Sequence, residues 1–288
     1  DLIDVFESFT PQYPADTWAR EAWGQVVEVT SKNGNTLGLS MKLGLQYTAS
    51  NSPRIRKINP LRNIQVKNLH LQRAIDNGET DGLRFQYTAN VSVYNIKSWR
   101  ASDRAHINIV NSHKVSIARS GFDNAWTTSG GGYAYGVLAS LNSSKIKIVD
   151  NWFRNLRHHV LLQAGANHSV IAYNSMEPSY YDLNGCGSDL SLHGNNAHNN
   201  LFEGNQFYRA AHDGTHGVNG PRNTYYRNQG SQIDIVDNQT DRNNVIGNDI
   251  TLALNIGSGS STNFIEGNRV AGTVQWQTLN SGSNLPAS

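Results

Sequence analysis

Short apolar segments, most of them ending in asparagine, recur along much of this 288-residue chain. Neighbouring segments close 20 to 31 residues apart. The closing residues are Asn68, Asn95, Ser120, Asn151, Asn174, Asn205, Asn228, Asn248 and Asn268. A repeat of this length is typical of a solenoid, in which each unit buries its apolar face against the next.

The composition of the repeats indicates which kind of solenoid they form. Each repeat has room for two or three brief strands and shows no helical period, which predicts a parallel β-helix of about nine coils. Stacked coils place equivalent side chains about 4.8 Å apart, so the closing asparagines would form a ladder of amides. Such a ladder explains why the chain contains 35 asparagines. A β-sandwich with Asn-Gly hairpins remains the alternative fold, but it does not require this period.

The N-terminal region is less regular than the repeats. The segments 24–30 and 36–40 flank Asn33-Gly34 and predict a β-hairpin. Residues 16–23 are expected to form a short helix or an extended cap, because an uncovered solenoid end exposes strand edges. We therefore divide the chain into an N-terminal cap with the first strands (1–60), a β-helix (61–277) and a flexible tail (278–288).

Composition excludes several classes of protein. The net charge is +2 and only 16% of residues are charged, so the chain lacks the basic stripe that nucleic-acid binding needs. No window approaches the roughly 18 consecutive apolar residues of a membrane span. Cys186 is the only cysteine, which excludes a disulfide framework.

Several short pieces between residues 136 and 221 carry a family resemblance. They are Gly136-Val-Leu, Asn155-Leu-Arg-His158, Gly165-Ala-Asn167, Leu192-His-Gly194 and the run from His216 to Pro221. With them, the stretch from Gly24 to Gln277 resembles bacterial secreted right-handed parallel β-helix proteins of the pectate-lyase-like superfamily. The resemblance implies a right-handed coil, an extracellular location and a carbohydrate-active role. The motifs of polygalacturonases and of calcium-dependent pectate lyases are not visible, so no substrate follows from it.

The two longest repeats contain insertions that are rich in aromatic residues. The first runs from Trp126 to Tyr135 and the second from Pro178 to Gly187. Solenoid insertions often line the binding face, and aromatic rings provide stacking platforms for sugars. The residues that we expect to contact substrate there are Tyr133, Tyr135, Tyr180, Tyr181 and Asp182. The alternative is that both are ordinary loops that close over a hydrophobic edge.

Histidine is concentrated in the same part of the chain, where seven of the ten lie between residues 158 and 216. Asp189, Ser191 and His193 alternate with two leucines, which predicts a strand with the leucines inward and the polar residues outward. A shift of 23 residues between coils aligns His193 with His216, and a different register places Gln163 beneath His193. We therefore predict a polar stripe with its neighbours, formed by Gln163, His193, His216, Asp189, His212, Asp213, Asn219, Arg222 and Tyr225.

These residue types suit β-elimination on an acidic glycan. The reaction needs a cation to neutralise the uronate carboxylate, a base to remove the adjacent proton and an acid for the leaving oxygen. Arg222 or Arg157 would neutralise, and His193 or His216 would act as base. A tyrosine, Tyr180, Tyr181 or Tyr225, would protonate. The residues that we predict to be catalytic are His193, His216, Asp213, Arg222 and Tyr225. A lysine base cannot come from the second half, because Lys147 is the last lysine.

Other functions remain open at the level of sequence. A glycoside hydrolase needs two carboxylates, which Asp182 or Asp189 could provide together with Asp213. A non-catalytic adhesin or filament subunit that self-associates through its coil ends is a further alternative. No cofactor is expected. The acidic residues are too few to favour a calcium site, and the histidines lack the close spacing of a transition-metal site. The bland alternative for the histidines is a hydrogen-bonded ladder with structural value only.

Overall fold

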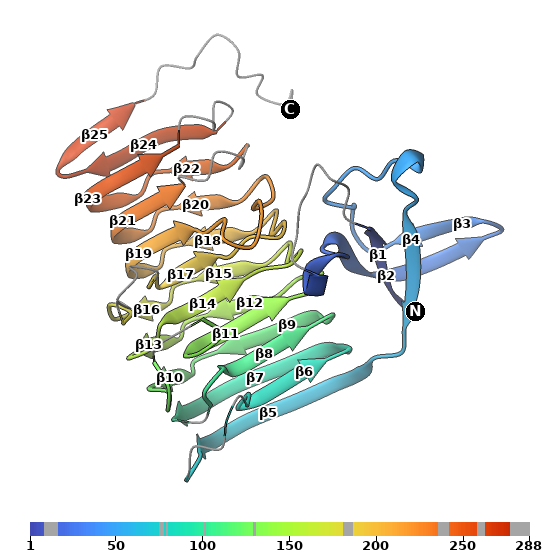
Figure 1. The fold of residues 1–288 in the computed structure, drawn as a ribbon, viewed down its shortest axis with the longest axis horizontal. Helices are drawn as coiled ribbons and strands as arrows, with labels where there is room; N and C mark the ends of the chain where they lie inside the picture. Colours follow the sequence, from blue (N-terminus) through green and yellow to red (C-terminus); the bar gives the residue numbers. More distant parts are fainter. Residues whose placement is uncertain are drawn as a thin grey trace.

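The computed structural model is an all-β protein dominated by one stack of parallel strands (Figure 1). The structure describes residues 1–8, 17–74, 78, 80–100, 102–128, 131–180, 187–235, 242–257 and 263–276. Four further strands form a separate antiparallel sheet near the N-terminus. The predicted parallel β-solenoid is therefore confirmed, whereas the predicted tail lies outside the described residues.

Three faces, which we call A, B and C in chain order around each coil, make up the solenoid. Face A consists of β6 (Leu83–Gln86), β8 (Ala105–Val110), β11 (Tyr135–Ser140), β14 (His158–Leu162), β17 (Leu190–Leu192) and the second halves of β19 (Gln206–His212), β21 (Gln229–Ile235) and β23 (Asp249–Ile256). Parallel pairing connects each strand to its equivalent in the next coil.

Face B carries the segments that the sequence repeat identified. It consists of parts of β5 (Leu61–Gln72) and β7 (Thr88–Trp99), followed by β9 (His113–Ala118), β12 (Lys147–Val149), β15 (Val170–Ala172), β18 (Leu201–Glu203), β20 (Thr224–Tyr226), β22 (Asn244–Ile246) and β24 (Phe264–Val270). Nine stacked segments correspond to about eight turns of the chain.

Face C is shorter, and the stack ends in a hairpin. Face C consists of the end of β7, β10 (Gly121–Asp123), β13 (Trp152–Arg154), β16 (Ser175–Met176) and the first halves of β19, β21 and β23. The last strand, β25 (Thr273–Trp276), pairs antiparallel with β24 and covers its free edge. Figure 1 shows β5 and β25 at opposite ends of the stack.

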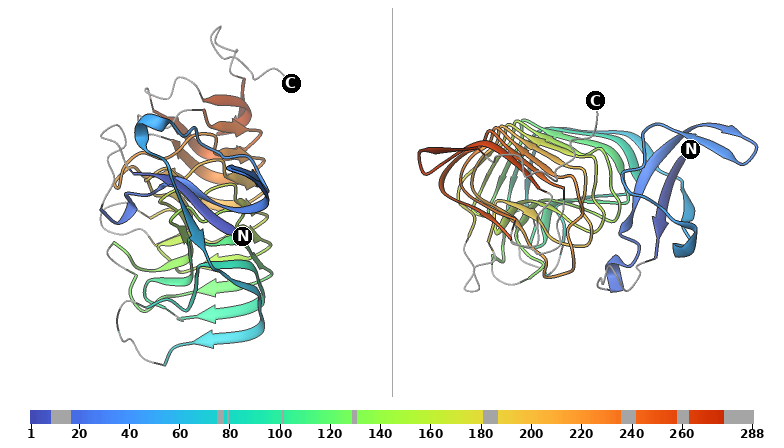
Figure 2. Two further views of the ribbon diagram at one scale, coloured as in Figure 1. Left: turned by 90° about the vertical axis from the view of Figure 1, so that its right-hand side faces the viewer. Right: turned by 90° about the horizontal axis from the view of Figure 1, so that it is seen from above.

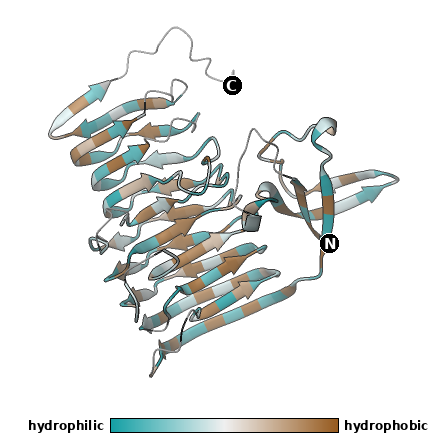
Figure 3. Cartoon of the chain, in the orientation of Figure 1, coloured by the Kyte–Doolittle hydropathy of each residue, from teal (hydrophilic) through white to brown (hydrophobic). Residues whose placement is uncertain are grey.

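The interior of the solenoid is filled by columns of apolar side chains. Central residues of consecutive B strands, such as Ile171, Phe202, Tyr225 and Val245, all belong to one buried cluster. Apolar bands accordingly follow the stacked strands in Figure 3. Because every strand is hydrogen-bonded on both sides by equivalent strands, burial and pairing fix the same register.

The corner between faces B and C contains the predicted amide ladder. Each asparagine donates its Nδ2 hydrogen to the Oδ1 atom of the next, at 2.8–3.1 Å. The members are Asn151, Asn174, Asn205, Asn228, Asn248 and Asn268. The residue before each ladder position has positive φ, for example 55° at Tyr173 and 61° at Gly204, which explains the recurring Gly-Asn pair.

A second amide ladder, which we did not predict, lines the corner between faces A and B. Asn200 donates to Asn223 at 3.0 Å, and Asn243 donates to Asn263 at 3.2 Å. The backbone N–H of Asn223 donates to Asn243 and connects the two pairs. Both tight corners are therefore built from buried asparagine amides.

The N-terminal sheet is a small antiparallel unit beside the solenoid (Figure 2). Its strands are β1 (Leu2–Glu7), β2 (Trp23–Asn33), β3 (Thr36–Leu39) and β4 (Arg54–Ile58), in the order β3-β2-β1-β4. The predicted hairpin is confirmed as β2–β3, with Gly34 at a φ of 57° in its turn. Two 3₁₀ turns, η1 (Thr17–Ala19) and η2 (Ala49–Asn51), complete this region.

The N-terminal region docks on the A/B corner of the middle coils. Ala19 and Ala22 pack against Ala164, and the carboxamide of Asn142 donates to Asp4 at 3.0 Å. The backbone N–H of Val26 donates to the carbonyl oxygen of Asn142 at 3.0 Å. These contacts hold η1 beside the ends of the face A strands.

Candidate functional site

A cavity of about 580 Å³ lies at the ends of the face A strands. Its volume is typical of small-molecule binding sites. Its lining residues are Trp18, Arg104, Gly131, Gly132, Tyr135, Arg157, Gln163, His193, Asp213, Thr215 and His216. We call this cavity the His193 pocket, because five of the predicted residues, Tyr135, Gln163, His193, Asp213 and His216, meet there.

His193 and Asp213 form a close pair in this pocket. His193 directly follows β17 and Asp213 directly follows β19, and the two strands pair with Leu192 beside His212. The Oδ2 atom of Asp213 lies 2.7 Å from Nδ1 of His193. A carboxylate in this position keeps the Nδ1 proton on the neutral imidazole, so Nε2 is the nitrogen that can accept a proton.

Thr215 keeps Asp213 ionised and oriented. Its backbone N–H and its hydroxyl donate to Oδ1 of Asp213, at 2.8 Å and 2.5 Å. Burial alone would raise the pKa of Asp213, but His193 and Thr215 outweigh it and hold the pKa of this carboxyl well below its ordinary value. Asp213 is therefore an anion at neutral pH, and its charge stabilises a protonated His193.

His216 contacts His193 edge-on, with ring centroids 4.8 Å apart, so the predicted contact is confirmed. The strand register before the pair is 20 residues, because Leu192 lies beside His212, and it becomes 23 only at β20, where Leu201 lies beside Thr224. Three extra residues in the loop that carries His216 account for the change. This loop brings the His216 ring over His193.

Arg104, Arg157 and Tyr135 lie at the other ends of the face A strands. Tyr135 begins β11, and the two arginines precede β14 and β8, the strands on either side of it. The hydroxyl oxygen of Tyr135 accepts hydrogen bonds from the backbone N–H of Gly132 at 3.0 Å and from Nη1 of Arg157 at 3.3 Å. Since the hydroxyl accepts both bonds, its own proton remains available for donation.

Gln163 occupies the position that the sequence predicted. Leu162 pairs with Leu192, which places Gln163 beside His193 in the adjacent coil. Both residues line the His193 pocket. The carboxamide of Gln163 gives the pocket a neutral donor and acceptor next to the histidine pair.

A third histidine, His158, lies behind the pocket. Its ring centroid is 5.9 Å from that of His193 and 5.5 Å from that of Tyr135. Burial, with smaller effects of Arg157 and His193, lowers the pKa of His158 to about 3, so the ring is neutral. Its Nδ1 atom lies 3.0 Å from the carbonyl oxygen of Ser188, which makes Nδ1 the protonated nitrogen. His158 therefore supports the pocket as a neutral ring.

Two of the predicted residues are in the solenoid core instead. Tyr225 is fully buried and stacks on Phe202 with centroids 4.7 Å apart, so it is not the acid that we predicted. His212 packs on Tyr225 at 5.8 Å, and burial lowers the pKa of His212 to about 3. Neither residue lines the His193 pocket, because both point inward from their strands.

Asp189 has a structural position. It is buried and accepts hydrogen bonds from the backbone N–H groups of Ser179, Tyr208 and Arg209, at 2.8, 2.5 and 3.0 Å. Burial raises its pKa, and His159, 3.4 Å away, opposes this effect. The predicted exposure of Asp189 is therefore wrong. Ser191 and His193 are also buried, although His193 still lines the pocket.

Two other predicted residues stabilise the loops near the pocket. The Oδ1 atom of Asn219 accepts the backbone N–H of Gly194 at 2.9 Å, which joins the loop after β19 to the loop after β17. Arg222 donates to Asn199 at 2.7 Å and to the carbonyl oxygen of Gly44, so it holds the N-terminal region. Arg222 does not line the pocket, and Arg157 takes the place that we gave it.

The tyrosines of the two insertions are dispersed. Tyr135 lines the pocket, whereas the partly buried Tyr133 and the exposed Tyr180 do not. Tyr181 and Asp182 lie outside the described residues, as does Cys186.

Sequence reasoning missed three lining residues: Trp18, Arg104 and Thr215. The Trp18 ring contacts His216 edge-on with centroids 6.0 Å apart, although 198 positions separate the two. Only the docking of η1 on the solenoid brings them together. Thr215 carried a signal, because Asp213 and Thr215 have the spacing of a local side-chain turn.

Metal ligation and membrane insertion have no support in the described part of the chain. No group of three or more histidine, cysteine, aspartate or glutamate side chains among these residues is arranged to hold a metal ion. None of the helices found there has the length and apolar character of a membrane span.

Comparison with known proteins gives distant structural similarities. No protein-family model matches the sequence, and no curated protein matches it. The tailspike protein gp49 from Pseudomonas phage LKA1 has a TM-score of 0.47 and 12% identity, over 95% of this chain and 59% of the tailspike chain. The DFA-IIIase from Arthrobacter chlorophenolicus A6 in complex with DFA-III has a TM-score of 0.35 and 13% identity, over 73% of this chain and 56% of that one. This chain thus spans less than two thirds of either protein.

Proposed function

We propose that this protein is a secreted lyase that cleaves an acidic polysaccharide by β-elimination in the His193 pocket. The observation that carries the proposal is the close pairing of His193 with Asp213 in one cavity with Arg104 and Arg157. The pair provides a base, and the arginines provide the positive charge that a uronate carboxylate requires.

Each step of the reaction has a residue in the pocket. For a uronate linked through O4, Arg104 and Arg157 neutralise the carboxylate and make the proton on C5 more acidic. His193 removes that proton, and the electron pair forms a double bond between C4 and C5. The bond between C4 and O4 breaks, and the Tyr135 hydroxyl gives its proton to the departing oxygen. Asp213 stabilises the imidazolium that forms on His193.

The same geometry favours a lyase over a glycoside hydrolase. Hydrolysis by the common mechanisms requires two carboxyl groups on either side of the scissile bond. Among the described residues, Asp213 is the only carboxylate in the pocket lining. Asp189, its predicted partner, is buried against backbone N–H groups. Elimination needs no second carboxylate.

An absorbance assay tests this proposal. Polygalacturonate, alginate, hyaluronan and chondroitin sulfate would each be incubated with the protein, and the unsaturated product would be followed in the near ultraviolet. We expect at least one polymer to give this absorbance, His193→Ala to abolish it, and His70→Ala, on the exposed part of β5, to retain it.

The opposite outcomes are equally clear. New reducing ends without near-ultraviolet absorbance would show hydrolysis and overturn the lyase mechanism. Binding to a polymer without either product would make the protein a non-catalytic glycan-binding solenoid.

A further inference from the structure

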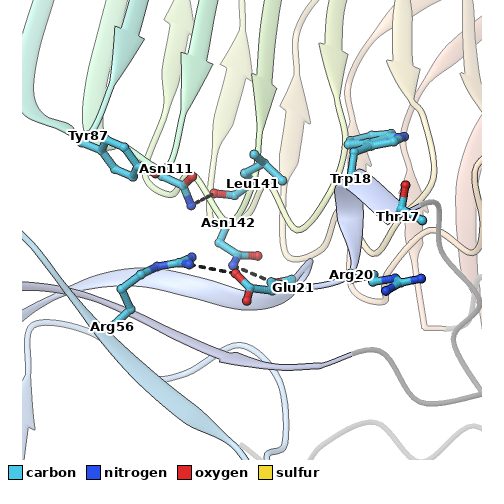
Figure 4. Close-up of a pocket in the computed structure, with 9 residues that line it drawn as sticks. All are labelled: Thr17, Trp18, Arg20, Glu21, Arg56, Tyr87, Asn111, Leu141 and Asn142. Carbon is cyan, nitrogen blue, oxygen red and sulfur yellow. Dashed lines mark hydrogen bonds and ion pairs between the residues drawn. The ribbon is translucent and has the colours of Figure 1, made fainter.

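A second cavity, of about 420 Å³, lies next to the His193 pocket (Figure 4). Tyr87, Asn111 and Leu141 of the solenoid form one side of it. Arg20 and Arg56 of the N-terminal region lie on the other side, and Trp18 stands at one end of the solenoid row. We call it the Tyr87 cavity.

Both cavities lie along one edge of the solenoid. In six consecutive coils, the residue directly after the face A strand lines one or the other cavity. These residues are Tyr87, Asn111 and Leu141 in the Tyr87 cavity, then Gln163, His193 and Asp213 in the His193 pocket. With coils about 4.8 Å apart, the row extends roughly 24 Å parallel to the solenoid axis.

Trp18 is shared by the two cavities. Its side chain is 45% exposed, yet its position is fixed, because the neighbouring Ala19 is fully buried against Ala164. Its ring contacts His216 on the side of the His193 pocket. A polymer that follows the solenoid edge from one cavity to the other would therefore pass this indole ring.

The Tyr87 cavity has groups that suit an acidic sugar. Arg56 is neutralised by Asp4 at 2.7 Å and Glu21 at 2.9 Å. Arg20, in contrast, has no carboxylate within ion-pair distance among the residues that the structure describes. Tyr87 is 42% exposed and has a φ of 53°, a conformation that bulky side chains rarely adopt and that is common at functional positions. Arg20 can bind a carboxylate and Tyr87 can stack on a sugar ring.

We propose that the Tyr87 cavity is a distal subsite for an acidic polysaccharide that lies along the solenoid edge, crosses Trp18 and reaches the His193 pocket. The inference rests on the proposed function for the class of ligand, but it concerns binding rather than cleavage. Oligosaccharides long enough to fill both cavities should then bind more tightly than short ones, and Arg20 and Tyr87 should contribute only to the long ones.

The test is calorimetric binding of a length series to the His193→Ala protein. Disaccharide to octasaccharide fractions of polygalacturonate, alginate and hyaluronan would be titrated, alone and with Arg20→Ala or Tyr87→Ala added. We expect either addition to weaken octasaccharide binding about tenfold and to leave disaccharide binding unchanged. Lys32→Ala, which removes an exposed cation from the β2–β3 hairpin, is the matched control and should change neither.

Three results would overturn the subsite: an equal loss at all lengths, no loss at any length, or no binding of any fraction. Unfolding temperatures of the variants would show that the fold is intact. The outcome is separable from the proposed function, because cleavage by the His193→Ala protein would contradict the mechanism while leaving the length dependence interpretable.

Discussion

Asp213 is the residue on which the proposed chemistry depends most closely. It holds the Nδ1 proton of His193 and supplies the negative charge that a protonated His193 needs. The sequence allowed us to predict that His193, His216 and Gln163 meet, because the repeat spacing aligns neighbouring coils. It did not reveal the role of Thr215, because that depends on how the loop after β19 turns back on Asp213.

Replacement of Asp213 by asparagine should lower turnover by about 10²–10⁴-fold. The amide keeps the size of the side chain but removes the charge, and its NH₂ group can donate to Nδ1 and favour the wrong tautomer of His193. The initial rate of near-ultraviolet absorbance on the best polymer would measure the effect. An Asp213→Asn protein with the rate of the wild type would eliminate this role.

Tyr225→Phe tests the correction to the predicted site. The buried hydroxyl of Tyr225 has no hydrogen-bond partner in the described part of the chain, so its removal should leave the free energy of unfolding unchanged or raise it by about 1 kcal/mol. Activity should be unchanged. Chemical denaturation and the absorbance assay would give both numbers, and a large loss of activity would return Tyr225 to the catalytic set.

The error at Tyr225 was avoidable. Phe202, Tyr225 and Val245 each stand three residues before a ladder asparagine, so the repeat itself marks them as one column. Val245 and Phe202 are apolar, which identifies that column as the inward one. The contributions of Trp18 and Arg104 were not accessible in this way, because they depend on where the N-terminal region docks.

At the scale of elements, the asparagine ladders turn the corners between faces. Asn205 accepts hydrogen bonds from the backbone N–H and the side chain of Asn174, at 3.1 and 2.9 Å. It donates to Asn228 at 3.1 Å and to the carbonyl oxygen of Ile171 at 2.8 Å. A single side chain thus satisfies buried polar groups in three coils.

Asn205→Ala should therefore lower the free energy of unfolding by about 3 kcal/mol or more, because it leaves several buried polar groups without partners. Asn244→Ala is the matched control. Asn244 is only partly buried and donates one side-chain hydrogen bond, to Thr224 at 3.0 Å, so its loss should cost less than about 1 kcal/mol. Urea denaturation would measure both variants, and equal effects would contradict the structural role of the ladder.

At the scale of the whole molecule, the solenoid buries many neutral histidines. The pKa values of His158, His198 and His212 fall to about 3 and that of His106 to about 4, in each case mainly because of burial. An exposed histidine has a pKa of about 6.5. Between these values the unfolded chain binds protons that the folded chain does not bind.

Stability should consequently fall as the pH falls below about 6.5, by up to about 1.4 kcal/mol per pH unit for each of these histidines. Above that pH the same groups are neutral in both states and contribute no pH dependence. Unfolding temperatures measured at constant ionic strength at about pH 7.5 and about pH 5 would test the sign. An equal or higher unfolding temperature at the lower pH would contradict the assignment of these rings as neutral.

The architecture of the solenoid was predictable because its period, its apolar columns and the asparagines at the B/C corner all repeat in the sequence. The A/B ladder was harder to see, because serines such as Ser169 hold the equivalent positions in earlier coils. The site is built partly from irregular loops and from a distant N-terminal segment, and such contacts leave no period.

The most direct test of the central claim is a crystal structure of the His193→Ala protein with an acidic oligosaccharide bound. We predict that the sugar lies in the His193 pocket, with one uronate carboxylate paired to Arg104 or Arg157 and the Tyr135 hydroxyl beside the linking oxygen. A sugar bound elsewhere on the solenoid, with this pocket empty, would contradict the account.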